Sequence, residues 1–171
     1  MDNLEIAQFI HVLLNNQRIR DAIDTITSKA VLILGRFTPE RKAILEAMRA
    51  ELRQRDYLPI IFDFDPSPNR TTIETIKTLA SMAKFVVANL TDAKSVLQEL
   101  QAVVPTLPSV SVQLIIKRTE HEYGILDYIR SYQSVVSKTY EYETVEEVIS
   151  SIQENIIAPV EAKLRQLRNK E

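Results

Sequence analysis

The sequence contains no cysteine and no tryptophan, and only two of its 171 residues are glycine. Without cysteine, disulfide bonds, thiolate metal sites and cysteine nucleophiles are excluded, and a reducing compartment is compatible with the composition. Gly35 and Gly124 stand far apart in the chain. Walker loops and dinucleotide-binding turns need clustered glycines, so we expect neither phosphoryl transfer nor hydride transfer.

Neither sign of charge dominates, and long hydrophobic runs are missing. The chain has 21 Lys and Arg residues and 23 Asp and Glu residues. Because the two signs nearly balance, no strong electrostatic field attracts nucleic acid or an anionic membrane. No run of about 18 apolar residues occurs, as a membrane-spanning helix would need. The acidic N-terminus does not fit a signal peptide, and His11 and His121 lack a metal-ligand spacing. We expect a soluble, cytoplasmic protein without a metal site.

Apolar residues recur at helical spacing from the start of the chain. They predict two short helices, which form an N-terminal helical leader over residues 1–28. An apolar helix so near the start needs a surface to pack against. We therefore expect a second copy of the chain, or a partner domain in a longer chain, to cover it.

Strand and helix patterns alternate through residues 29–162, which we interpret as one α/β domain, and a polar tail follows at 163–171. Continuous β-branched and aliphatic runs are typical of strands buried on both faces. They predict strands at residues 30–34, 58–62, 85–88, 110–116 and, at the sheet edge, 134–136.

The helices of this domain follow from caps and apolar stripes. Thr38 caps a helix that has Pro39 at its first position. Two more helices cover residues 73–83 and 93–104, and one long helix carries the last stripe, from residue 145 to residue 160. Short connections between alternating strands and helices predict a flavodoxin-like, doubly wound parallel sheet of about five strands in the order 2-1-3-4-5.

The sheet topology predicts where a ligand would bind. In doubly wound sheets, ligands lie beyond the carboxyl ends of the strands at the point where strand order reverses, which is here between the first and third strands. This rule selects the segments 35–38 and 89–92. A receiver domain shares the topology but needs acids after the first strand and an Asp ending the third. The chain has Gly35-Arg36 and Asn89 there, so phosphoacceptor chemistry is not expected.

One stretch, residues 85–100, is informative about function. There a strand runs into Asn89-Leu90-Thr91-Asp92, and the next helix carries Glu99-Leu100. This arrangement resembles the TIR-like and nucleoside 2-deoxyribosyltransferase-like superfamily, over about two thirds of the chain in the order of its elements. The resemblance implies that Glu99 acts on an N-glycosidic bond. It also implies a bacterial signalling or defence effector.

The resemblance and the chemistry together favour NAD as the substrate, with no separate cofactor. Nicotinamide is already a cationic leaving group, so one carboxylate can stabilise the oxocarbenium-like centre that forms at the ribose. At the first strand we expect Arg36 to pair with phosphate, Phe37 to stack on a base and Thr38 to donate to a phosphate. The other residues expected to bind the nucleotide are Gly35, Asp63, Asn89 and Thr91.

Two other interpretations remain open at this point. The domain could be a catalytically silent, TIR-like interaction module that self-associates or docks a partner through its leader and terminal helices. In that case Glu99 is a surface acid favoured by the helix dipole. Hydrolysis of a nucleoside or another nucleotide would differ from NAD cleavage only in substrate.

Overall fold

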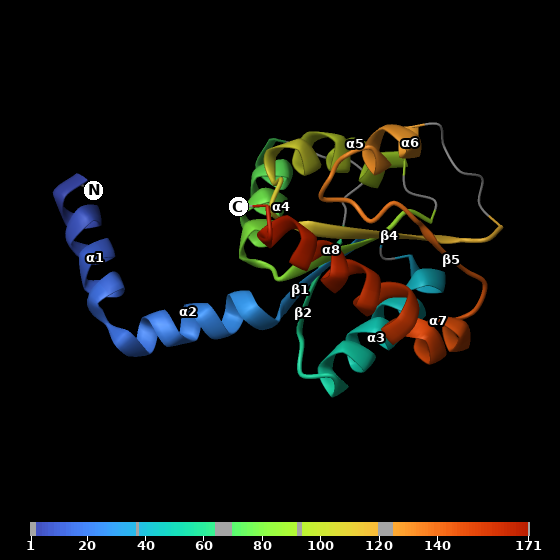
Figure 1. The fold of residues 1–171 in the computed structure, drawn as a ribbon, viewed down its shortest axis with the longest axis horizontal. Coiled ribbons are helices and arrows are strands. Elements are labelled where there is room, and N and C mark those ends of the chain that lie inside the picture. Colours follow the sequence, from blue (N-terminus) through green and yellow to red (C-terminus); the bar gives the residue numbers. More distant parts are fainter. Residues whose placement is uncertain (1–2, 37, 64–69, 92–93, 120–124, 171) are drawn as a thin grey trace.

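A five-stranded parallel sheet forms the centre of the computed structural model (Figure 1), and its strand order, β2-β1-β3-β4-β5, confirms the predicted topology. The structure describes residues 3–36, 38–63, 70–91, 94–119 and 125–170. The strands are β1 Ala30–Gly35, β2 Leu58–Asp63, β3 Phe85–Asn89, β4 Ser111–Lys117 and β5 Tyr140–Tyr142.

The edge strand differs from the prediction. Residues 134–136 were expected to form it, but Val135 makes only an isolated bridge with Val112, and the strand that pairs with β4 begins at Tyr140. Both segments carry aromatic or β-branched residues, so composition alone does not separate them. The displacement matters for the site because β5 ends at Tyr142, close to the ends of β3 and β4.

Helices cover both faces of the sheet (Figure 1). One face is covered by α3 Pro39–Gln54, α7 Val145–Ile152 and α8 Ala158–Arg168, and the other by α4 Arg70–Met82, α5 Lys94–Val103 and α6 Ile125–Arg130. Successive strand residues alternate between the two sides: Leu32 and Leu34 pack against the α4–α5 side, and Val31 and Ile33 against the α3–α8 side. Each face of the sheet therefore has its own apolar core.

The last helix is not uniform. Where one helix was predicted, a π-helical turn, Gln153–Ile157, separates α7 from α8. Pro159 lies in the first turn of α8 and has no backbone N–H to donate to the residue four positions earlier. The wider π turn lets the helix continue although this hydrogen bond cannot form. Beyond it, α8 continues to Arg168 and buries Leu164, within the stretch predicted as a polar tail.

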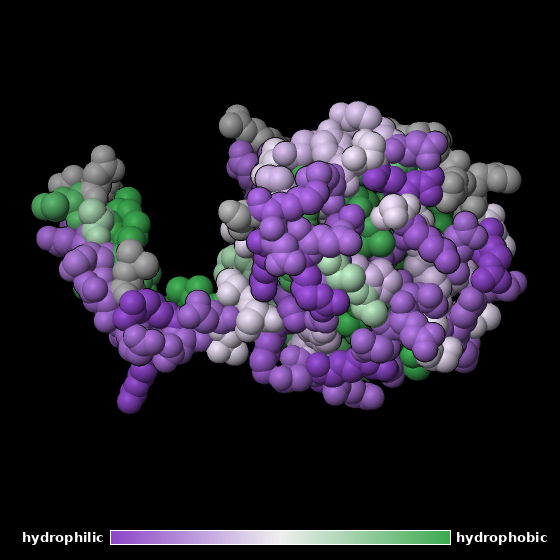
Figure 2. Space-filling model, viewed as in Figure 1, coloured by the Kyte–Doolittle hydropathy of each residue, from purple (hydrophilic) through white to green (hydrophobic). Residues whose placement is uncertain are grey.

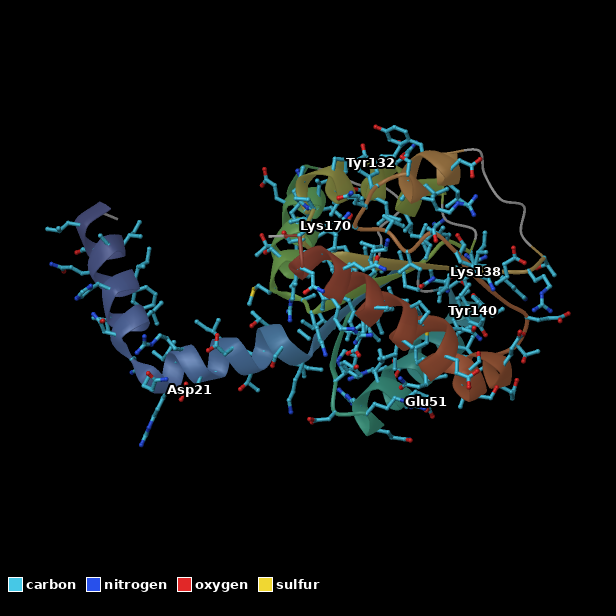
Figure 3. The ribbon with its side chains drawn as sticks, viewed as in Figure 1. Asp21, Glu51, Tyr132, Lys138, Tyr140 and Lys170 are labelled. Carbon is cyan, nitrogen blue, oxygen red and sulfur yellow. The ribbon has the colours of Figure 1, made fainter. Side chains whose placement is uncertain are left out.

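The two N-terminal helices, α1 Asn3–Asn15 and α2 Gln17–Lys29, extend away from the α/β domain (Figure 1). Asn16 separates them and caps α2 by accepting a hydrogen bond from the backbone N–H of Ile19. No residue of α2 is buried, and apolar side chains of α1 lie open on the surface in Figure 2. Figure 3 places Asp21 on this arm, away from the labelled residues of the domain. No helix in the described ranges is long and apolar enough to cross a membrane.

Candidate functional site

The carboxyl ends of β2, β1 and β3 lie side by side, as the strand order requires. Gly35 is in register with Asp63 on β2, and Leu34 is in register with Ala88 on β3. A Cβ atom built on Gly35 would lie 3.6 Å from the Cβ of Asn89 and 3.5 Å from Cδ2 of Leu45. The structure thus brings together Gly35, the backbone of Asp63 and Asn89. The side chain of Asp63 lies outside what the structure describes.

Asn89 and Thr91 belong to a buried hydrogen-bond network with Tyr142. The Asn89 side-chain amide donates to the Tyr142 hydroxyl at 3.1 Å, and its oxygen accepts from the Thr91 backbone N–H at 3.1 Å. The hydroxyls of Thr91 and Tyr142 lie 3.0 Å apart, and the Lys117 backbone N–H donates to Thr91 Oγ1 at 2.9 Å. This network ties together the carboxyl ends of three strands, β3, β4 and β5.

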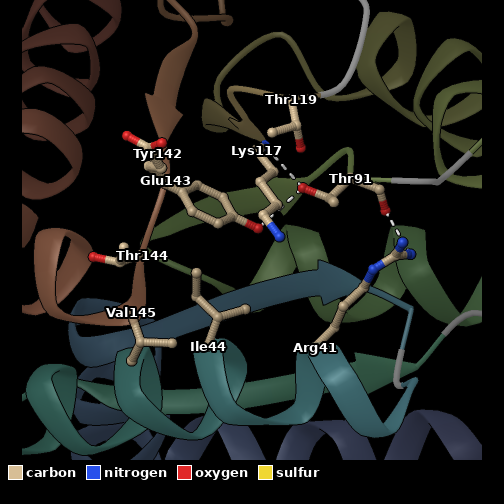
Figure 4. Close-up of a pocket in the computed structure, with 9 residues that line it drawn as sticks. All are labelled: Arg41, Ile44, Thr91, Lys117, Thr119, Tyr142, Glu143, Thr144 and Val145. Atoms are coloured by element: carbon tan, nitrogen blue, oxygen red, sulfur yellow. Dashed lines mark hydrogen bonds between the residues drawn. The ribbon is translucent and has the colours of Figure 1, made fainter.

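A cavity of about 230 Å³ opens beside this network, between α3 and the start of α7 (Figure 4). Arg41 forms one wall, and its guanidinium donates to the Thr91 backbone carbonyl at 2.9 Å. The residues lining the cavity are Arg41, Ile44, Thr91, Lys117, Thr119, Tyr142, Glu143, Thr144 and Val145. Most of these side chains are polar, so the cavity suits a small polar ligand.

Glu99 lies on α5, on the other side of the sheet. Its neighbours along the helix, Val96, Leu100 and Val103, belong to the core that includes Leu32 and Leu34. Glu99 itself is only 3% exposed, and its Oε2 has no hydrogen-bond partner among the described residues. Burial therefore raises the pKa of the Glu99 carboxyl above its ordinary value. The Asn89–Thr91–Tyr142 network faces the opposite core, so the sheet separates it from Glu99.

The remaining predicted residues surround the end of β1. Arg36 is half-buried. Thr38 is the N-cap of α3 by position, but its side chain makes no capping hydrogen bond, and its Oγ1 is buried without a partner in the described parts of the chain. Phe37 lies outside the described residues. Like Glu99 Oε2, Thr38 Oγ1 is therefore a buried polar atom without a hydrogen-bond partner among the described residues.

Sequence reasoning missed Arg41, Lys117 and Tyr142. Tyr142 was missed because the edge strand was expected at residues 134–136, whereas β5 is Tyr140–Tyr142. Lys117 ends the apolar run of β4, and a lone cation at a strand end is the kind of signal that could have found it. Arg41 lies in the first turn of α3, where a basic residue is disfavoured by the helix dipole, and this too could have marked it.

Two further observations limit how the site can be interpreted. Among the described residues, no group of three or more His, Cys, Asp or Glu side chains is placed to hold a metal ion. Comparisons with models of known families, with curated proteins and with solved structures found no match to this chain.

Proposed function

We propose that this chain is a TIR-like, nucleotide-binding domain that cleaves the nicotinamide–ribose bond of NAD, with Glu99 as the catalytic carboxylate. The observation that supports this most strongly is the burial of Glu99 with one oxygen unpartnered among the described residues. An unpaired carboxyl in an apolar core destabilises a fold. A group retained under those conditions, with a pKa raised by burial, is a candidate for function.

The chemistry suits a single carboxylate. Loss of neutral nicotinamide from NAD leaves positive charge on the ribose C1′, and a nearby carboxylate stabilises that charge. Water then adds to C1′ and releases one proton, so that the products are ADP-ribose and nicotinamide. The positive charge of bound NAD would also favour the ionised form of Glu99 and lower its pKa in the complex. Binding of NAD would therefore favour release of the proton from Glu99.

The residues around the end of β1 would hold the rest of the nucleotide. Arg36 would pair with a phosphate, and the hydroxyl of Thr38, which has no partner among the described residues, would donate to one. Gly35, against which Leu45 and Asn89 pack, would border the nucleotide at the end of β1. Asp63 and Phe37, at the ends of β2 and β1, complete the contacts in this proposal. Asn89 and Thr91 lie across the sheet from Glu99 and bond to each other and to Tyr142, so in this proposal they support the edge that holds the nucleotide.

The test is NAD turnover by the purified chain, with release of nicotinamide and ADP-ribose followed by chromatography at high protein concentration. Glu99→Gln should slow turnover by at least about 100-fold, the lower end of what a positioned carboxyl contributes. Glu46→Gln, on the exposed side of α3, is the matched control and should leave turnover unchanged. Equal turnover by wild type and Glu99→Gln would refute the assignment, as would a wild-type protein that neither binds nor cleaves NAD.

A second candidate function is a self-association module, and the exposed N-terminal helices favour it. Most of the large apolar side chains exposed on the described surface lie on α1 and α2, with Leu4 and Phe9 each 63% exposed. Exposed apolar patches of this kind mark interaction sites. On this reading Glu99 has no catalytic role.

Charge favours a second copy as the occupant of this surface. α1 carries no Lys or Arg, so it lacks the basic side chains with which interfacial helices bind anionic membranes. In α2, Arg18 and Arg20 precede Asp21 and Asp24. An antiparallel copy of α2 would place each basic pair opposite an acidic pair, in a two-fold symmetric contact.

Light scattering tests this candidate. The wild type should be a dimer, Phe9→Asp should be a monomer, and Gln8→Asp, which adds the same charge on the polar side of α1, should remain a dimer. A monomeric wild type at concentrations of about 100 μM, which would place any self-association in the weak range, contradicts the candidate.

A further inference from the structure

The cavity between α3 and α7 is a separate feature from the Glu99 site. It opens on the α3–α8 side of the sheet, beyond the carboxyl ends of β3, β4 and β5, whereas Glu99 lies in the core on the other side. The carboxyl edge is where parallel sheets place their ligands. The volume, about 230 Å³, is smaller than the pockets of about 300–1,000 Å³ that enclose drug-sized ligands. It would hold one small polar group rather than a whole dinucleotide.

The charges around the cavity are unevenly compensated. Glu143 is the one carboxylate among the residues that line it, and that carboxylate accepts a hydrogen bond from Arg118 at 2.9 Å. Lys117 makes no ion pair with any described residue, and its side chain is exposed. Figure 4 shows its ammonium directed into the cavity beside the Tyr142 hydroxyl. Lys117 therefore adds a positive charge for which the described walls supply no partner.

The walls also supply hydrogen-bond donors. Thr119 brings a hydroxyl to the cavity, and Arg41 brings a guanidinium on the opposite side from Lys117 (Figure 4). The Tyr142 hydroxyl is bonded to Asn89 and Thr91, and the Thr144 hydroxyl caps α7 by accepting from the Glu147 backbone N–H. A guanidinium, an ammonium and a hydroxyl together match the oxygens of a phosphate group. The shape is also fixed before any ligand arrives, because Thr91 accepts from both Arg41 and the Lys117 backbone. A preformed site loses little entropy on binding.

We propose that this cavity is a phosphate-binding site, in which Lys117 and Arg41 hold the phosphate group of a small molecule. The group can belong to a free phosphorylated compound or to a nucleotide. The proposal does not rest on NAD cleavage, because no step in it involves Glu99. Its effect on the domain would be transmitted through Thr91, which contacts the cavity and also joins the buried network of Asn89.

Calorimetric titration of the whole chain with inorganic phosphate, pyrophosphate and ADP-ribose tests the proposal. Wild type should bind at least one of the three, and Lys117→Ala should weaken that binding by about tenfold or more, the loss of one charge-assisted contact. Lys42→Ala removes the same charge from an exposed position of α3 outside the cavity and should bind as wild type does. Amide chemical shifts of Thr91 and Lys117 should move on titration.

The outcomes are distinct. Similar affinities for inorganic phosphate and ADP-ribose would indicate a free phosphorylated ligand, and a much tighter ADP-ribose complex that is equally sensitive to Lys117→Ala would indicate a nucleotide. Binding by none of the three, or equal losses in Lys117→Ala and Lys42→Ala, would overturn the proposal. Glu99→Gln should bind phosphate as wild type does, so failure of the proposed NAD cleavage would not be mistaken for failure of this site.

Discussion

Two glutamates on the helices of this domain, Glu161 and Glu99, are half-buried and buried respectively, and their surroundings differ. Glu161, on α8, lies at the amino end of the sheet and accepts hydrogen bonds from the Lys84 ammonium at 2.7 Å and the Tyr57 hydroxyl at 2.6 Å. The Lys84 ammonium also lies 5.2 Å from the centre of the Tyr57 ring. Burial by itself would raise the pKa of Glu161, but the bonds from Lys84 and Tyr57 outweigh it, and the pKa is lowered.

Glu99, on α5, is more deeply buried, and its Oε2 has no hydrogen-bond partner among the described residues. Its pKa is raised by burial. The comparison teaches that burial of a carboxyl is not in itself a sign of function, because a carboxyl with hydrogen-bond partners such as Glu161 can serve the fold. The absence of described partners is what distinguishes Glu99, and the variants below test that distinction, beginning with the largest expected effect.

Lys84→Met should destabilise the protein by about 2–4 kcal/mol, because it leaves Glu161 half-buried without its cation. The free energy of unfolding, measured by urea denaturation at pH 7, gives this directly. Lys42→Met, at an exposed position of α3, is the matched control and should change the free energy little. A similar small change in Lys84→Met would mean that Glu161 is not an anchor of the fold.

Tyr142→Phe should cost about 1–3 kcal/mol, because Asn89 and Thr91 each lose a buried hydrogen-bond partner. The control is Tyr128→Phe, since that hydroxyl is exposed on α6 and bonds only to Tyr132 among the described residues. Urea denaturation of both variants measures the difference. Equal unfolding midpoints would show that the network at the carboxyl edge does not support the sheet.

Glu99→Gln should raise stability at alkaline pH by up to about 1 kcal/mol, as removal of an unfavourable functional group often does. Because the folded-state pKa is raised, the folded chain keeps a proton that the unfolded chain has released. The stability contributed by Glu99 is therefore complete below its ordinary value of 4.5 and is lost as pH rises through the folded pKa.

This prediction is checked by the difference in melting temperature between wild type and Glu99→Gln, measured from pH 4 to pH 8. Glu161→Gln should show the opposite dependence of stability on pH. Since the pKa of Glu161 is lowered, its contribution is present above pH 4.5 and is lost as pH falls through the folded pKa. The same pH trend in both variants would contradict the contrast between the two glutamates.

The smallest effect is expected at the surface. Lys29, at the end of α2, forms a 2.6 Å ion pair with Asp56, and the two side chains are 42% and 83% exposed. Solvent screens such a pair, so Lys29→Ala should change stability by less than about 1 kcal/mol. A double-mutant cycle with Asp56→Ala measures the coupling. A larger coupling would show that this contact helps to fix α2 against the domain.

The sequence was sufficient to predict the sheet, because β1 and β3 are almost entirely apolar, as is typical of parallel strands covered by helices on both faces. Strand order followed from the short crossovers. The edge strand was misplaced, because a strand of three residues, Tyr140–Tyr142, carries too little pattern to outweigh its neighbours. The burial of Glu99 was also beyond reach, since a helical position at the border of an apolar stripe can face either way.

The candidate site was predicted in part. Gly35, Asn89 and Thr91 lie where the strand-order rule places them, because that rule depends only on topology. The links from Asn89 and Thr91 to Tyr142, and from Thr91 to Arg41, join segments far apart in the chain, and no local pattern carries that information. The roles proposed for Glu99, Arg36 and Thr38 in NAD cleavage remain predictions.

The π turn of the last helix has a consequence for register. Val148, Ile152, Ile156, Val160 and Leu164 are all buried and recur every fourth residue. In a regular helix of about 3.6 residues per turn, such a stripe would wind gradually around the helix and leave the sheet. The wider turn at Gln153–Ile157 rotates α8 back about the helix axis. As a result, the buried residues of α8 stay in line with those of α7. Deleting one residue from this turn would rotate Val160 and Leu164 away from the core together, as one rigid unit.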